Sequence, residues 1–102
     1  MRTPDYPSED QPKWAAVDDY FSQQLIPADS HFQAALVANR QAGLPAHDVS
    51  ALQGKMLGLF IKMINASRVL EIGTLGGYST LWMAQALGAE GKITTLDRKS
   101  TV

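Results

Sequence analysis

Apolar residues recur with helical spacing in the part of the chain before residue 66. Between residues 13 and 27 they fall three and four positions apart, at Trp14, Val17, Phe21 and Leu25. This pattern predicts an amphipathic helix that ends before Pro27. A second helix is predicted to follow, with Asp29 or Ser30 as its N-cap and Gly43 as its end, and with Phe32, Ala35 and Leu36 buried on one face.

A third helix is predicted most clearly, because its start signal and its apolar stripe agree. Ser50 followed by Gln53 fits a capping box. The stripe then continues as far as a turn at 65–67, through Val49, Leu52, Met56, Phe60, Met63 and Ile64. We expect the two methionines to pack in the core. Gly54 and Gly58 share one face, and their cost inside a helix predicts a close approach that offsets it.

The pattern changes to that of a strand, a helix and a second strand after residue 67. Residues 68–72 form a short apolar run with one carboxylate, followed by a glycine-rich turn and an apolar helix over 79–87 that ends at Gly88. Residues 92–96 are predicted to form a second strand, with Asp97 at its end. Together these elements predict a βαβ unit with parallel strands, in the α/β class.

Composition excludes several classes of partner. The chain has 102 residues, with 9 basic against 10 acidic side chains and a formal charge of -1, so no global field attracts nucleic acid or anionic lipid. It has no cysteine, and we find no apolar run long enough to cross a membrane or to serve as a signal peptide. We therefore expect a cytoplasmic chain, with a flexible arm over 1–12 and one domain over 13–102, in which helices occupy 13–65 and the βαβ unit 68–97.

The glycine turn is the candidate for binding chemistry. A dinucleotide fingerprint needs glycine at its first, third and sixth positions, but counting from Gly73 the third is Leu75 and the sixth is Tyr78. Glu71 would also repel phosphates, whereas it would attract an ammonium group. The turn therefore favours a cationic ligand over a pyrophosphate.

Asp97 completes this prediction at the end of the next strand. An acidic side chain there can accept both hydroxyls of a ribose. A ligand with a cationic amino-acid end and an adenosine end is S-adenosylmethionine. Each acid alone also fits a purely structural role, since acids at strand ends cap turns.

Three segments, over 45–55, 68–82 and 95–97, closely resemble the small-molecule O-methyltransferases that include the catechol and caffeoyl-coenzyme A enzymes. The run Glu-Ile-Gly-Thr-x-x-Gly-Tyr-Ser is the most specific part of the resemblance. It implies a Rossmann-like fold, S-adenosylmethionine as cofactor, a homodimer whose contact uses the N-terminal helices, and in many members a divalent cation such as Mg²⁺. The substrate would be a small hydroxylated molecule.

The resemblance also implies which residues bind the cofactor: Val49, Glu71, Gly73, Thr74, Ser79 and Asp97. In the family the metal ligands and the catalytic base follow later strands, so we expect none within this chain, which would be an N-terminal part with little activity alone. The alternatives are a non-catalytic cofactor-binding or dimerising fragment, a half-domain that binds a nicotinamide cofactor, and a methyltransferase acting on a modified tRNA nucleoside.

Overall fold

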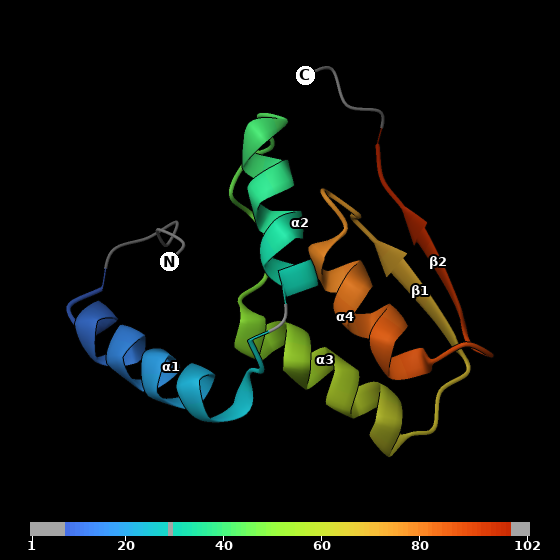
Figure 1. Cartoon of the computed structure of the whole chain (residues 1–102), viewed down its shortest axis with the longest axis horizontal. Helices are drawn as coiled ribbons and strands as arrows, with labels where there is room; N and C mark the ends of the chain where they lie inside the picture. The colour runs from blue at the N-terminus through green and yellow to red at the C-terminus, as the bar shows by residue number, and fades with distance from the viewer. Residues whose placement is uncertain (1–7, 29, 99–102) are drawn as a thin grey trace.

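The structure of the chain, a computed structural model, describes residues 8–28 and 30–98 (Figure 1). Its elements follow the order α1 (Gln11–Leu25), α2 (Ser30–Gln41), α3 (Ala51–Met63), β1 (Arg68–Ile72), α4 (Tyr78–Leu87) and β2 (Lys92–Leu96). Both strands occupy the predicted residues, and the ends of the helices lie within about two residues of the predicted ones. The predicted N-cap Asp29 lies outside the described residues. Within those residues no helix is both long and apolar enough to span a membrane.

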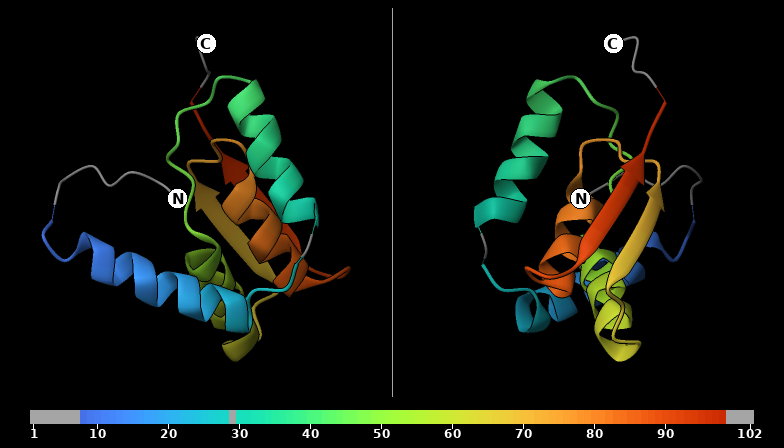
Figure 2. Two further views of the ribbon diagram at one scale, coloured as in Figure 1. Left: turned by 60° about the vertical axis from the view of Figure 1, so that its left-hand side comes forward. Right: turned by 90° about the vertical axis from the view of Figure 1, so that its right-hand side faces the viewer.

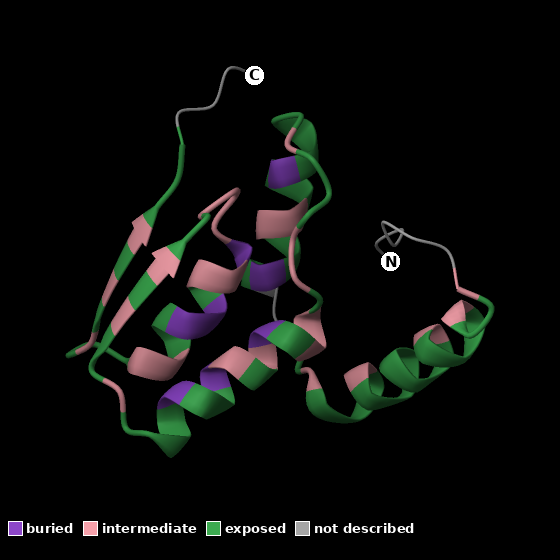
Figure 3. Ribbon diagram, turned by 180° about the vertical axis from the view of Figure 1, so that it is seen from behind, coloured by how far each residue is buried: buried purple, intermediate pink, exposed green. Residues whose placement is uncertain are grey.

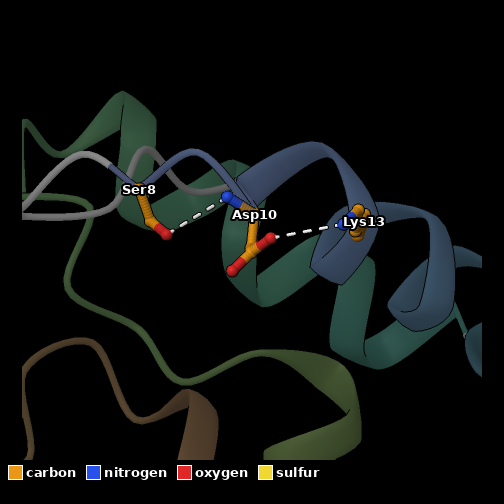
Figure 4. A network of polar contacts seen from close by, with 3 residues as sticks. All are labelled: Ser8, Asp10 and Lys13. Atoms are coloured by element: carbon orange, nitrogen blue, oxygen red, sulfur yellow. Dashed lines mark hydrogen bonds and ion pairs between the residues drawn. The ribbon is translucent and has the colours of Figure 1, made fainter.

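Helix α1 begins at Gln11, so the last residues of the predicted arm already belong to it, while residues 1–7 lie outside the described residues. The side chain of its N-cap, Asp10, makes no capping hydrogen bond within the helix. It instead lies 3.5 Å from the Lys13 ammonium group, and its main-chain N–H donates to the Ser8 hydroxyl at 3.2 Å (Figure 4). An ion pair this exposed contributes little to stability.

The two strands form a parallel sheet, as the βαβ prediction requires, with Arg68 opposite Lys92 and Ile72 opposite Leu96. Side chains alternate between its faces. Helix α4 covers one face, whereas no described element covers the other in the views of Figure 2. On that open face Leu70 and Ile72 are 66% and 74% exposed. The sheet is therefore buried on one side only.

The core lies where α2, α3 and α4 meet. The ring of Phe32 stacks on Trp82, with centroids 4.0 Å apart and planes 9° apart, and contacts Tyr78 edge to face at 6.3 Å. All three rings are buried, and partly buried side chains pack around them: Ile26, Ala35, Leu36, Val49 and Ala51. Figure 3 shows the buried positions gathered on the facing sides of these helices. The predicted buried face of α2 is thus confirmed.

The close approach predicted from the two glycines of α3 is confirmed at the α3–α4 interface. A Cβ at Gly54 would lie 2.3 Å from Cδ1 of Trp82, so the indole ring occupies the space that a side chain would need. A Cβ at Gly58 would lie 3.4 Å from the Cβ of Ala86, which is ordinary contact. The packing of the indole ring offsets the helical cost of glycine at position 54.

The expectation that the methionines of α3 pack in the core is wrong. Met56 and Met63 are 46% and 77% exposed. Helix α3 turns its glycine face, together with Ile61, toward its neighbours and leaves much of its apolar stripe open. The large apolar residues of α1 are likewise exposed, namely Trp14, Val17, Tyr20, Phe21 and Leu25. The spacing predicted these helices correctly, but it did not identify the face that is buried.

Candidate cofactor site

The carboxylate of Glu71 is the centre of a hydroxyl network at the end of β1. It accepts hydrogen bonds from Ser79 at 2.5 Å, from Thr80 at 2.5 Å and from Thr95 at 2.7 Å. Ser79 and Thr80 lie in the first turn of α4, and Thr95 lies opposite Glu71 in the sheet register. Hydrogen bonds to an ionised acceptor are the stronger kind, so three of them fix the orientation of this half-buried carboxylate.

The side chain of Thr74 joins the same network through the sheet. Its hydroxyl lies 2.6 Å from that of Thr95, whose own hydroxyl donates to Glu71. The Thr74 side chain therefore faces β2, and its main chain remains the part that can face a ligand.

The main chain of the glycine turn, over residues 73–77, has open space along one flank. Gly73 and Gly77 have φ of 98° and 84°, and a Cβ at either residue would meet nothing within 4 Å. Leu75 also lies in the left-handed region, with φ of 51°. A residue other than glycine is strained there, and such strain persists only where the surroundings impose it. The open flank along the glycines is the space that a ligand close to the main chain would fill.

Asp97 holds the strained turn from the end of β2. Its Oδ2 atom accepts the main-chain N–H of Leu75 at 2.6 Å, and its Oδ1 atom accepts that of Arg98 at 2.7 Å. The N–H of Gly73 also donates to the carbonyl of Leu96 at 2.6 Å. The exposed carboxylate is thereby fixed beside the turn, with lone pairs remaining on both oxygens.

Val49 comes from the loop that precedes α3. It is half-buried and packs against the cluster that contains Tyr78, the first residue of α4. The structure thus brings Glu71, Thr74 and Ser79 into one network and connects Asp97 to the turn between them. Val49 joins this region through its apolar packing against the cluster of Phe32, Tyr78 and Trp82. The roles of these residues in binding the cofactor stay predictions.

Sequence reasoning missed four residues of this region. Thr80 and Thr95 carry hydroxyls to Glu71, and the pairing register places Thr95 opposite it. These two contacts could be predicted from the sequence, because a threonine in the first turn of a helix and one in the neighbouring strand can each reach a carboxylate at the end of a strand. Asn39 and Gly76 also meet at the turn, since a Cβ at Gly76 would lie 2.2 Å from the Asn39 carboxamide. No sequence pattern indicates that contact.

Other parts of the described chain offer no second centre of this kind. Within residues 8–28 and 30–98 no three His, Asp or Glu side chains gather as metal ligands. A hollow of about 140 Å³ lies between α3 and α4, lined by residues that include Lys55, Gly58, Lys62 and Trp82. None of the predicted cofactor-binding residues lines it, so the glycine turn with its two acids is the candidate site.

Known proteins provide an independent comparison. The sequence model of the family described as O-methyltransferase matches residues 27–101. A catechol O-methyltransferase of Mycobacterium tuberculosis is 46% identical over 89 residues, which are 87% of this chain and 40% of that protein.

Two solved structures agree with this. The O-methyltransferase of Bacillus cereus, in complex with S-adenosylhomocysteine, is 51% identical with a TM-score of 0.79 over 82% of this chain and 38% of its own. That of Streptomyces achromogenes involved in tomaymycin synthesis, in complex with S-adenosylmethionine, is 44% identical with a TM-score of 0.78 over 86% and 40%. The chain therefore has part of the fold of these enzymes and spans about 40% of their length.

Proposed function

This chain belongs to the O-methyltransferase family, and from that premise we propose that its glycine turn binds S-adenosylmethionine for methyl transfer to a small hydroxylated, catechol-like substrate. The observation that carries the proposal is the open turn with a fixed carboxylate on each side, Glu71 at the end of β1 and Asp97 at the end of β2. Relatives solved with the methyl donor or its product share the fold of this region.

At the adenosine end, Asp97 would hold the ribose. Each carboxylate oxygen already accepts one main-chain N–H, which fixes the plane of the group before any ligand arrives. The remaining lone pairs would accept the two neighbouring hydroxyls of the sugar. A carboxylate oriented in advance loses little freedom on binding, and this favours affinity.

At the amino-acid end, Glu71 and Ser79 would meet the ligand together. The Glu71 carboxylate attracts an ammonium group, and the hydroxyls around it keep its charge at one position. The main chain of Gly73 and Thr74 would lie against the ligand, and Val49 would contact it from the loop before α3. The donor supplies a methyl group on a sulfonium centre, and these residues contribute by holding it in one orientation.

The acceptor side of the reaction and the assembly of the protein are parts of the same proposal. No described residue is assigned as a catalytic base, so we propose that this chain alone binds the donor with little or no turnover. Mg²⁺ is implied by the resemblance, but within the described residues no three His, Asp or Glu side chains gather to hold it. We extend the proposal to a homodimer and, on the lack of cysteine, to a cytoplasmic setting.

Titration calorimetry with S-adenosylhomocysteine tests the donor site. We expect the wild-type chain to bind, Asp97→Ala to bind at least about tenfold more weakly, and Glu90→Ala, which removes an exposed acid before β2, to bind as wild type. Wild-type affinity in Asp97→Ala would remove the ribose role. Tight binding of NAD in its place would favour the nicotinamide alternative.

Turnover assays complete the test. With S-adenosylmethionine, Mg²⁺ and a panel of catechols, we expect no more than background methylation by this chain alone. Robust turnover would contradict the proposal that the acceptor machinery lies outside the described residues, without affecting the result of the titration.

A further inference from the structure

Asn39 in α2 contacts two other parts of the chain, the loop before α3 and the glycine turn. It lies near the end of α2 and, at 8% exposure, is a buried polar side chain. Its carboxamide Nδ2 donates to Oδ1 of Asp48 at 3.2 Å. The same carboxamide lies against the glycine turn, where a Cβ at Gly76 would come within 2.2 Å of it. A buried amide in this place is costly unless its contacts are maintained.

The main chain of Asn39 orders the same loop from its other end. Its carbonyl accepts the N–H of Leu44 at 3.1 Å, while the N–H of Gly43 donates to the carbonyl of Arg40 at 3.1 Å. With Gly43 at φ of 77°, these two bonds form a Schellman motif that ends α2. The loop over 42–50 is therefore held by Asn39 at Leu44 and again at Asp48.

Val49 follows directly after Asp48 in this loop. Ser50, the next residue, caps α3 by accepting the N–H of Gln53 at 3.1 Å. The position of Val49 is thus fixed between a side-chain hydrogen bond and a helix cap. On the other side of Asn39, Gly76 belongs to the turn that Asp97 holds through Leu75.

We propose that Asn39 is a positioning residue of the cofactor site. It clamps the loop over 42–50 to the glycine turn, so that Val49 and the turn face the ligand from fixed positions. We call the three residues Asn39, Asp48 and Gly76 the Asn39 clamp. The inference rests on the proposed function, because it assigns the clamp to the site that would bind S-adenosylmethionine. A side chain at position 76 would clash with the carboxamide, which already fills that space.

Exchanging the two side chains tests the clamp. Asn39→Asp places two carboxylates in contact, so we expect S-adenosylhomocysteine to bind about tenfold more weakly by calorimetry. The double variant Asn39→Asp with Asp48→Asn restores an amide-to-carboxylate hydrogen bond with the roles reversed. We expect it to recover affinity to within about threefold of wild type, because the two residues interact directly. Gln33→Glu, an exposed change on the same helix, serves as the control for added charge and should bind as wild type.

Hydrogen exchange in the ligand-free chain gives a second measurement. We expect Asn39→Asp to speed amide exchange in both the 42–50 loop and the 73–77 turn, and the double variant to reverse this. Wild-type affinity in Asn39→Asp, or a double variant as weak as the single one, would overturn the inference. If the wild-type chain does not bind S-adenosylhomocysteine, the proposed function fails, and the exchange data then show whether the clamp itself exists. Unchanged exchange in both segments would reject the clamp as well.

Discussion

Helices α1 and α4 carry large apolar residues of the same kinds but lie in opposite environments. Each has one tryptophan, and Trp82 in α4 is 7% exposed whereas Trp14 in α1 is 49% exposed. Helix α4 contacts α2, α3 and both strands, while among the described elements α1 contacts only α3. Figure 1 shows α4 between the sheet and the other helices and α1 extending away from them.

The difference shows what each helix contributes. Helix α4 both fills the core and presents Ser79 and Thr80 to Glu71, so packing and the candidate site depend on the same element. Helix α1 contributes neither a buried residue nor a predicted site residue. Stability should therefore respond strongly to changes in α4 and weakly to equivalent changes in α1.

The two tryptophans provide the largest expected contrast. Trp82→Ala removes a buried, stacked indole ring, and truncations of this kind cost about 3–5 kcal/mol. Since whole domains are stable by only about 5–15 kcal/mol, we expect the variant to lose a large part of its stability and to unfold at a much lower urea concentration. In the monomer, at low protein concentration, Trp14→Ala should change the free energy of unfolding by no more than about 0.5 kcal/mol, as surface substitutions do. Urea denaturation followed by circular dichroism measures both. Equal losses would contradict the difference in burial.

Adding one methyl group at either glycine of α3 tests how tightly α3 packs against α4. Gly54→Ala would force a Cβ to within 2.3 Å of the Trp82 ring, and overpacking costs about 1–3 kcal/mol. Gly58→Ala meets Ala86 at an ordinary 3.4 Å, so the gain in helix propensity, up to about 1 kcal/mol, should dominate. Thermal unfolding of both variants should therefore shift in opposite directions. A stabilised Gly54→Ala would show that α4 can move away from α3.

Local patterns predicted the elements of this fold because their causes are local. The strand at 68–72 and the capping box at Ser50 depend on neighbouring residues, and both are confirmed. Which face of a helix is buried depends on partners distant in sequence. That is why the apolar stripe of α3 predicted a helix correctly but placed Met56 and Met63 in the core wrongly.

The candidate site divides in the same way. Glu71 and Ser79 are eight residues apart across one strand-turn-helix unit; the resemblance implied both as residues of one site, and the structure joins them by a hydrogen bond. The contact of Asn39 with Gly76 joins α2 to the turn, and no periodicity or turn chemistry indicates it. A recognisable local motif thus points to residues within a single βαβ unit, and it does not predict those that reach the unit from another element.

Helix caps give a smaller contrast between the packed region and α1. The Ser50 hydroxyl accepts the N–H of Gln53 at 3.1 Å, and the Gln53 side chain accepts the N–H of Ser50 at 2.9 Å. Ser50→Ala should therefore cost about 1 kcal/mol. Asp10→Ala removes an N-cap whose side chain makes no capping bond, so we expect a loss of only a few tenths of a kcal/mol. Chemical denaturation distinguishes the two, and a larger loss for Asp10→Ala would indicate that α1 is more tightly coupled to the core than its exposure implies.

A substitution on the exposed face of α1 should have the smallest effect on stability. It also tests whether α1 stays exposed, in contrast to α4, when the protein associates. If a second copy covers this face, as we propose, both helices are buried and differ only in which chain covers them. Val17→Lys places a charge at a side chain that is 52% exposed, so the free energy of unfolding should change by no more than about 0.5 kcal/mol while self-association weakens at least tenfold. Gln23→Lys adds the same charge elsewhere on the helix and should leave association unchanged. Sedimentation velocity over a range of concentrations measures this, and wild-type association in Val17→Lys would exclude the α1 face from the contact.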